Sequence, residues 1–239
     1  MESCTIIIPV YQEESVIEKT ITELIEVFKK SGFDFEILAV IDIAPNDKSH
    51  EIVSKIAQKN SEIVPIIRKR REGLASAIKE GITNANKEIT LIVMGDGSEN
   101  PQDLKEMVKK MHQGFDMVIG NRFVKGVKVY DYPLMKYFAN RLCNYVVRLM
   151  FGIHSKDITN AVKVYRTKYL KKLELESTGF EIFVEIPIKY HQMGYRNFTE
   201  FPLSHSAGDR KYSKFNLSNE GFRYFKTVIR CLLKGSKKK

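Results

Sequence analysis

Asp96 is the residue around which the chemistry of this chain can be placed. It follows the apolar residues 91–94 in the stretch TLIVMGDGSENP, which covers residues 90–101. An apolar run of this kind, without polar alternation, is typical of a strand buried on both faces of a parallel sheet. Ligands of open α/β sheets bind beyond the carboxyl ends of such strands, and Gly95 and Gly97 would let a ligand approach closely. The alternative for Asp96 is a solvated turn residue.

Strand and helix patterns alternate along the first half of the chain. Apolar runs of strand length occupy residues 4–10, 35–41, 63–67, 91–94 and 116–119. Helical periodicity covers residues 17–28, 50–59 and 74–85, and Gly32 is a fitting end for the first helix. This alternation predicts a Rossmann-like α/β fold, a doubly wound and mostly parallel sheet with helices on both faces. The loops at its carboxyl edge would bring together Tyr11, Glu13, Asp42, Asp47, Arg71 and Asp96.

Composition limits the partners and the compartment. The chain has 239 residues and a formal net charge of +10, which implies an anionic partner such as a phosphorylated small molecule, a nucleic acid or an acidic membrane surface. Its three cysteines lie far apart, which fits a reducing cytosol. No uncharged apolar stretch reaches the ~18 residues of a membrane span.

Several other chemistries lack their motifs. The sequence contains neither GxxxxGK[ST] nor GxGxxG, which argues against an NTPase or a dehydrogenase. The five histidines are scattered without metal-binding spacing. Nucleic-acid binding would rest on net charge alone, without a recognised module, and we do not expect it.

The order of the motifs resembles glycosyltransferase family 2, and within it the dolichol-phosphate or polyprenol-phosphate sugar transferases. The resemblance runs from residue 6 to about residue 214 through IIIPVYQEE, IDIAPNDKS, REGLASAIKEGI, VMGDGSENP, VIGNRFVKG, DITNAVKVYR, TGFEIFVEI and SHSAGDRKYSK. It implies a GT-A fold. It also implies an inverting, metal-dependent hexosyltransferase that takes its sugar from a nucleotide diphosphate sugar.

The resemblance also assigns the donor and metal residues. The nucleotide-sugar-binding residues are expected to be Pro9, Tyr11, Glu13, Asp42, Arg71 and Asp96. Ile43 stands where the family has a second Asp after Asp42, and Met94 stands at the first position of the Asp-x-Asp metal motif. Asp96 and Ser98 would therefore hold Mg²⁺ or Mn²⁺ together with the diphosphate and water, and Glu99 would contribute through water.

Basic and amide residues of the second half are expected to bind the acceptor phosphate. The resemblance assigns this role to Lys136, Asn140, Arg210 and Lys214. Arg122 follows the apolar run 116–119 at a strand end, so we expect it near the phosphates and catalytic together with Asp96. The alternative for the basic residues is a solvated surface. A phosphate monoester has a second pKa near 6, so such an acceptor is anionic at neutral pH and needs no strong general base. A sugar hydroxyl acceptor would need one, and Asp157 or Glu181 would be the candidates. The alternative for both carboxylates is a structural role.

Residues 216–239 are expected to form a basic amphipathic helix and a lysine-rich tail after a catalytic domain of residues 1–215. The apolar positions are Phe222, Phe225, Ile229, Leu232 and Leu233, and the basic positions are Arg223, Lys226, Arg230 and Lys234. Such a helix suits an anionic membrane surface, whereas the alternative is that its apolar stripe packs on the catalytic domain. We expect a cytoplasmic protein, peripheral at the cytoplasmic face of a membrane, with a nucleotide-sugar donor and a polyprenyl phosphate acceptor.

Two further functions stay open at this point. One is a family 2 transferase that acts on a saccharide hydroxyl in cell-surface glycan synthesis. The other is a nucleotide-sugar-binding relative that has lost turnover, because Ile43 and Met94 replace carboxylates. The sequence does not identify the sugar, the base, the lipid or the oligomeric state.

Overall fold

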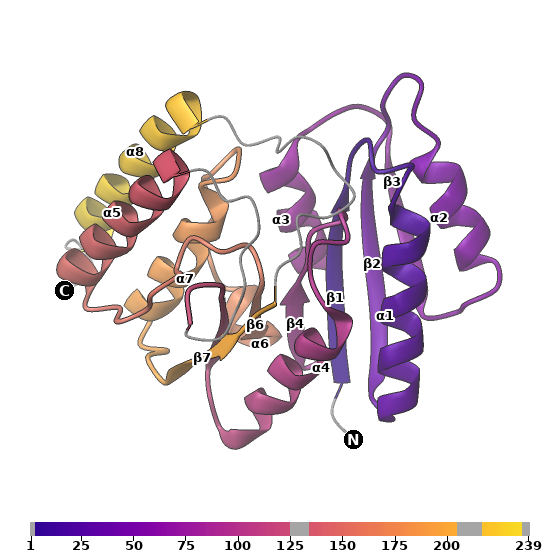
Figure 1. Ribbon diagram of the computed structural model, residues 1–239, viewed down its shortest axis with the longest axis horizontal. Coiled ribbons are helices and arrows are strands. Elements are labelled where there is room, and N and C mark those ends of the chain that lie inside the picture. The colour runs from indigo at the N-terminus through magenta and orange to yellow at the C-terminus, as the bar shows by residue number, and fades with distance from the viewer. Residues whose placement is uncertain (1–2, 125–133, 205–216, 236–239) are drawn as a thin grey trace.

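The computed structural model describes residues 3–124, 134–204 and 217–235 of the chain. Its centre is a seven-stranded sheet with the order β3-β2-β1-β4-β6-β5-β7 (Figure 1). The strands are β1 Ser3–Val10, β2 Asp34–Asp42, β3 Ile63–Arg68, β4 Ile89–Ile92, β5 Met117–Asn121, β6 Lys163–Arg166 and β7 Phe198–Pro202. The helices are α1 Ile17–Ser31, α2 Ser49–Ala57, α3 Leu74–Asn84, α4 Pro101–Lys110, α5 Leu134–Phe151, α6 Thr167–Leu170, α7 Ile182–Gln192 and α8 Leu217–Gly235.

The sheet separates two hydrophobic cores, as expected for a doubly wound fold. One core contains the apolar faces of α1 and α4 together with side chains of β1 and β2, such as Ile6 and Ile37. The other contains side chains of α3, α7 and α8, which pack around Tyr165 of β6 and Tyr190 of α7. Successive side chains of a strand point to opposite faces of the sheet, so Ile6 and Ile8 of β1 belong to the first core and Ile7 belongs to the second. The predicted α/β architecture with helices on both faces is confirmed.

The half of the sheet that contains the N-terminus is parallel, and the other half is mixed. The strands β3, β2, β1 and β4 run parallel to one another. The strand β6 runs antiparallel to both β4 and β5, whereas β5 and β7 are parallel. The sequence did not predict β6 and β7, because polar residues interrupt their apolar runs: Lys163 and Arg166 stand in β6, and Thr199 and Glu200 stand in β7. β4 is thus buried as expected, but only one of its two neighbours is parallel to it.

The predicted helices of the first half are confirmed with small shifts in their ends. The helix α1 ends at Gly32, which takes the left-handed φ of 73° and donates its N–H to the Lys29 carbonyl. The central strand ends at Ile92 instead of residue 94, although the N–H of Val93 still bonds to the Ile7 carbonyl at 3.0 Å. The turn that follows requires Gly97, whose φ is +68°. Met94 therefore belongs to the turn and not to the strand.

The C-terminal helix α8 exists as predicted, but it packs through a different face. Its buried residues are Thr227, Val228 and Cys231, and this face lies against α5 and α7 (Figure 1). The predicted apolar stripe is divided, since Phe222 and Phe225 are 69% and 62% exposed whereas Ile229 and Leu232 are partly buried. The alternative that this stripe packs on the catalytic domain therefore holds only for part of it. The division of the chain after residue 215 stays a prediction.

Candidate active site

The carboxyl ends of β1 and β2 bring the predicted donor-binding loops together. The side chain of Arg71 lies over the ring of Tyr11, with the guanidinium carbon 4.4 Å from the ring centre. The backbone N–H of Glu13 donates to the Ser49 hydroxyl at 3.0 Å, and this hydroxyl donates to Asp47 at 2.7 Å. These bonds tie the loop after β1 to the loop after β2. An arginine stacked on an aromatic ring beside buried polar groups is a suitable surface for an anionic nucleotide.

Asp42 is buried at the end of β2 and is held from three directions. Arg68 approaches its Oδ1 to 2.6 Å, and the backbone N–H groups of Glu72 and Gly73 donate to its two oxygens at 3.2 Å and 2.9 Å. Its carboxylate thus fixes the turn that begins α3. The sequence identified Asp42 but not Arg68, because Arg68 is the first of four consecutive basic residues of which the other three are exposed. A direct contact of Asp42 with the donor stays a prediction.

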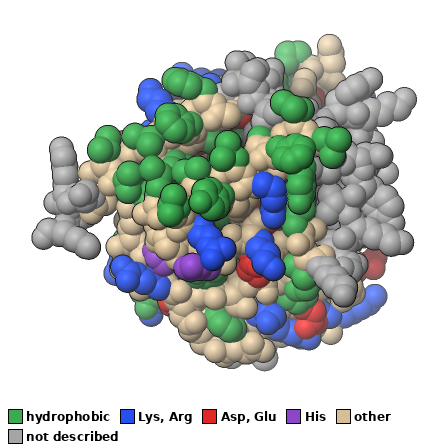
Figure 2. Space-filling model, turned by 60° about the vertical axis from the view of Figure 1, so that its left-hand side comes forward, with side chains coloured by type: hydrophobic (Ala, Val, Ile, Leu, Met, Phe, Trp, Pro, Cys, Tyr) green, Lys and Arg blue, Asp and Glu red, His purple; other side chains and the backbone are tan. Residues whose placement is uncertain are grey.

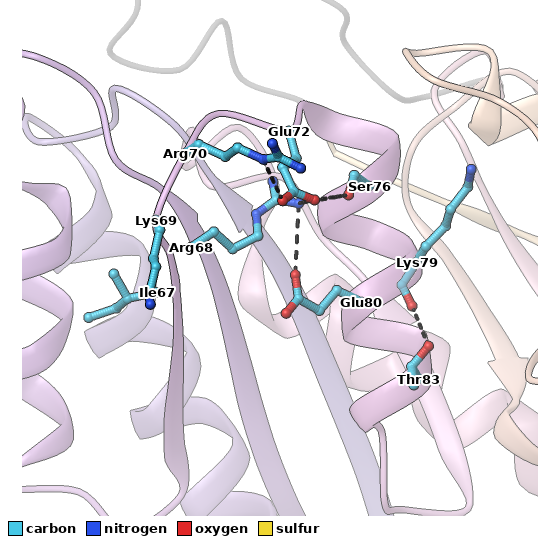
Figure 3. A pocket seen from close by; sticks show the side chains of 9 residues that line it. All are labelled: Ile67, Arg68, Lys69, Arg70, Glu72, Ser76, Lys79, Glu80 and Thr83. Carbon is cyan, nitrogen blue, oxygen red and sulfur yellow. Dashed lines mark hydrogen bonds and ion pairs between the residues drawn. The ribbon is translucent and has the colours of Figure 1, made fainter.

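A hollow of about 670 Å³ lies beside this turn, on the outer side of β3 and α3 (Figure 3). Figure 3 shows Arg68 in it, pointing towards Glu72, Ser76 and Glu80; the ion pair with Glu80 measures 3.8 Å. The residues that line the hollow do not include Asp96 or Arg122. The hollow therefore borders the donor edge and is not the centre of reaction.

Asp96, Ser98 and Glu99 form an oxygen-rich turn after β4. The N–H of Ser98 donates to Asp96 Oδ1 at 3.2 Å, and Gly95 lets the turn approach β1, since a Cβ there would lie 3.1 Å from the Pro9 carbonyl oxygen. Glu99 Oε2 is buried and accepts no hydrogen bond from the residues that the structure describes. Burial, together with the charge of Asp96, raises the pKa of Glu99 to about 8.

This oxygen set fits a small hard cation. Mg²⁺ and Mn²⁺ prefer carboxylate, hydroxyl and phosphate oxygens, and Mg²⁺ is commonly held by one or two carboxylates plus substrate phosphates. No group of three or more His, Cys, Asp or Glu residues gathers within the described parts of the chain. Asp96 and Ser98 would therefore hold the ion only together with oxygens of the donor diphosphate. Glu99 is the additional carboxylate that stands close enough to affect such a site.

Arg122 and Asp157 form a buried ion pair at the end of β5. Arg122 Nε lies 2.8 Å from Asp157 Oδ2, and its Nη2 lies 3.0 Å from Oδ1. Asn140 of α5 also donates to Asp157, at 3.2 Å. Burial alone would raise the pKa of Asp157, but the charge and hydrogen bonds of Arg122 hold it below its usual range. This geometry favours the structural alternative for Asp157 over the role of a general base.

Of the other predicted acceptor residues, the structure describes the side chain of Asn140 but not those of Lys136, Arg210 and Lys214. Asn140 is buried and bonded to Asp157, Thr159 and Asn144, so its first role in the free protein is to organise this network. Arg210 and Lys214 lie outside the described residues, as does the side chain of Lys136. Whether these three cations lie close together is therefore not described, and their phosphate-binding role stays a prediction.

Lys163 is a buried cation that the sequence did not single out. It lies on β6 and is 1% exposed, and its ammonium group donates to the backbone carbonyls of Asn160 and Phe183. Burial lowers its pKa to about 7, although the charge of Asp157 acts in the opposite direction. Its place in the motif DITNAVKVYR, between two valines, was the available signal.

Glu181 stands at the N-terminus of α7. Its Oε1 accepts hydrogen bonds from the backbone N–H groups of Thr178 at 2.9 Å and Gly179 at 3.1 Å. The carboxylate thus closes the turn that precedes the helix, which is a structural task. Its other oxygen, Oε2, is buried and has no hydrogen-bond partner among the described residues.

The helices α5 and α8 lie side by side and present a large apolar surface, which we call the α5–α8 face (Figures 1 and 2). Its strongly exposed members are Leu134, Met135, Phe138, Leu142, Tyr145, Leu149, Phe222, Phe225 and Leu233. Figure 2 shows hydrophobic side chains gathered on this side of the molecule, with Lys and Arg side chains next to them. An exposed apolar patch of this extent marks a surface that binds a membrane, a ligand or a protein.

The mixed seven-stranded sheet, with helices on both faces and an acidic turn at its carboxyl edge, is a GT-A-like α/β fold. The chain belongs to glycosyl transferase family 2, whose family model matches residues 5–174. The resemblance in its motifs to this family is therefore confirmed.

Curated relatives share about a quarter of its residues. A dolichol-phosphate mannosyltransferase of Pyrococcus furiosus is 27% identical over 95% of this chain and 63% of its own length. An undecaprenyl-phosphate 4-deoxy-4-formamido-L-arabinose transferase of Shewanella sediminis is 26% identical over 90% of this chain and also 63% of its own length. The chain thus spans less than two thirds of each of these relatives.

Solved structures share the fold. Glucosyl-3-phosphoglycerate synthase from Mycobacterium tuberculosis, in complex with Mn²⁺ and UDP-glucose, matches 97% of this chain and 79% of its own chain with a TM-score of 0.74 and 14% identity. The same synthase has also been solved with Mg²⁺ and UDP. At this identity the likeness supports the fold, and the expected GT-A architecture is confirmed.

Proposed function

We propose that this chain transfers a hexose from a nucleotide diphosphate sugar to a polyprenyl phosphate at the surface of a membrane. The observation that carries this proposal is the exposed α5–α8 face. One of its two helices, α5, also contributes Asn140 to the network around Arg122. The names of the relatives support the same acceptor class, since both act on a lipid-linked phosphate by their names.

The donor would lie along the carboxyl edge of the sheet. The loop with Tyr11 and Arg71 would receive the nucleoside and its phosphates. The turn with Asp96 and Ser98 would hold Mg²⁺ or Mn²⁺ against the diphosphate, and a bound ion would offset the charge of the departing nucleotide. The metal complexes of the related synthase support this assignment for the family.

The acceptor would bring its own nucleophile. A phosphate monoester is mostly ionised at neutral pH, so in-line attack on the anomeric carbon needs no general base and inverts its configuration. Arg122 would stabilise the phosphates electrostatically, and Asp157 holds its guanidinium in place. A saccharide hydroxyl acceptor would instead need a carboxylate as general base. Asp157 is engaged in the ion pair, whereas Glu181 has one oxygen held by two backbone N–H groups and keeps the other, so Glu181 is the candidate that such an acceptor would leave.

The α5–α8 face would contact the membrane. A polyprenyl phosphate lies at the headgroup level, and an apolar helical surface flanked by cations inserts at that depth. The charge of +10 favours an anionic bilayer over a second copy of the same chain, because two like-charged copies repel each other. None of the helices that the structure describes is long and apolar enough to cross a bilayer.

A transfer assay tests the proposal. The purified full chain would be incubated with Mn²⁺, radiolabelled UDP-glucose or GDP-mannose, and liposomes that contain polyprenyl phosphate. We expect a lipid-extractable sugar phosphate whose formation stops with EDTA and in Asp96→Asn. If label were transferred only to a soluble phosphate monoester or to a saccharide, the lipid acceptor would be refuted. Donor binding without any transfer would favour a binding relative without turnover.

A further inference from the structure

Two carboxylates from distant parts of the chain converge on Gly179. A Cβ atom at Gly179 would lie 2.9 Å from Glu181 Oε2 and 3.4 Å from Glu220 Oε2. Glu181 is 4% exposed, and neither of these two buried oxygens accepts a hydrogen bond within the described parts of the chain. A buried acceptor without a donor costs free energy, so an arrangement of two such oxygens points to a ligand that supplies donors.

Each carboxylate is held through other contacts than its buried Oε2. Glu181 keeps its orientation through Oε1, which accepts from two backbone N–H groups, whereas its Oε2 points to the side of Gly179. Glu220 is bonded to the backbone of Phe180, and its Oε1 forms a long ion pair of 3.8 Å with Arg223, whose side chain is 50% exposed. The guanidinium of Arg223 also lies at the Gly179 position, 2.7 Å from where a Cβ atom would stand.

The pair adjoins the donor edge on one side. The carbonyl oxygen of Thr178 lies 3.7 Å from the position of a Cβ at Gly73. Gly73 is the residue whose N–H donates to Asp42, so the turn that carries Glu181 packs directly on the turn that Asp42 fixes.

The pair adjoins the Arg122 network on the other side. The hydroxyl of Tyr224 donates to the Phe180 carbonyl at 2.8 Å, which ties α8 to the same turn. Burial raises the pKa of Tyr224 most; the charges of Glu220 and Glu181 act in the same sense and the charge of Arg122 acts in the opposite sense. The turn that carries Glu181 thus packs on the turn fixed by Asp42 and is bonded to a tyrosine whose pKa the charge of Arg122 also affects.

We propose that Glu181 and Glu220 form the subsite that binds the hydroxyl groups of the transferred sugar. Ionised carboxylates accept hydrogen bonds and repel phosphates, so the polyol end of the donor is the part that fits between them. Arg223 would turn outward when the sugar enters. This inference rests on the proposed use of a nucleotide-sugar donor, and it assigns the contacts that select the sugar.

Equilibrium binding separates the sugar contacts from the nucleotide contacts. Titration calorimetry with Mn²⁺ would measure the dissociation constants of UDP, UDP-glucose, GDP and GDP-mannose for the full chain. The variant Glu181→Gln keeps an oxygen for the two backbone donors but places an NH₂ group, which cannot accept, at the buried position. Glu220→Gln tests the second carboxylate. The control is Glu174→Gln, an exposed residue in the segment before the same helix.

For the nucleotide sugar that the unchanged chain binds more tightly, we expect each of the two variants to raise the dissociation constant by about ten-fold to a hundred-fold. This is the usual contribution of a hydrogen bond to a charged group. The nucleoside diphosphate should bind as before, and the control should bind both as the unchanged chain does. Unchanged sugar affinity in a folded Glu220→Gln variant, whatever the fate of Glu181→Gln, would overturn the subsite while leaving the proposed function intact. If the unchanged chain bound none of the four probes, the proposed function itself would be overturned.

Discussion

Replacing Asp157 by Asn should destabilise the protein far more than a typical surface charge change. The carboxylate is fully buried and forms two short bonds to the Arg122 guanidinium, which is itself only 13% exposed. Breaking a buried pair by neutralising one partner costs about 3–5 kcal/mol, because the other charge stays buried. For a chain of this size this loss corresponds to a fall in melting temperature of about 6–20 °C.

The pH dependence of this loss follows from the direction of the pKa shift. The pKa of Asp157 is lowered on folding, so its stabilisation is present above the unfolded value of about 3.9 and is lost as pH falls through the lower folded value. Acid titration of Asp157 itself therefore does not affect the comparison between pH 7.5 and pH 5. Lys163, whose pKa burial lowers to about 7 although the charge of Asp157 raises it, carries more charge at pH 5, so the difference in unfolding free energy between the variant and the unchanged chain should be larger at pH 5 than at pH 7.5. Urea unfolding followed by circular dichroism measures the unfolding free energy of the variant and of the unchanged chain at each pH.

The exposed pair between Lys87 and Asp34 supplies the matched control. Its distance is 2.7 Å, as short as the buried pair, but its side chains are 25% and 52% exposed. Asp34→Asn should therefore cost no more than about 1 kcal/mol. If Asp157→Asn cost no more than Asp34→Asn, the view that this ion pair organises the end of β5 would be refuted.

Three further outcomes follow from the structure. Asp96→Asn should abolish transfer and leave the melting temperature within about 2 °C, because a turn residue adds little stability; normal turnover in this variant would remove Asp96 from the metal site. The double variant Phe138→Ser and Phe225→Ser should lose sedimentation with anionic liposomes, and high salt should weaken that of the unchanged chain; equal binding by the folded variant would contradict the membrane role of the α5–α8 face. Burial raises the pKa of Cys143 to about 12, so a thiol reagent at pH 7.5 should label the native protein only slowly and the urea-unfolded protein at once; rapid native labelling would show that this part of α5 opens.

The parallel half of the sheet could be predicted because its signals are local. Each strand there is an apolar run followed by a loop and an amphipathic helix, and the parallel arrangement places the polar loop residues at one edge. Asp42 and Asp96 were found in this way. Arg68 was not, because nothing in a row of four basic residues shows which of them turns inward to Asp42.

The second half could not be predicted as well, because its order depends on contacts between distant residues. The strand β6 has only four residues, and one of them is the buried Lys163. Neither its length nor an alternation of apolar and polar residues therefore indicates a strand. The partner of Asp157 lies 35 residues away. The exposed face of α8 was also misread in part, since amphipathicity identifies an apolar side without showing whether the protein or its surroundings cover that side.

The edge strand β3 bears on how this protein avoids aggregation. The carbonyl of Glu62 accepts from the N–H of Ile37 in β2, and backbone groups alternate between the two sides of a strand, so the backbone of Pro65 faces the free edge. Exposed Val64 and Ile67 would otherwise make this edge attractive to a foreign strand. Proline has no N–H to donate, so a strand arriving there would find a gap in the hydrogen-bond ladder. β3 is thereby protected against sheet-to-sheet polymerisation by a single residue.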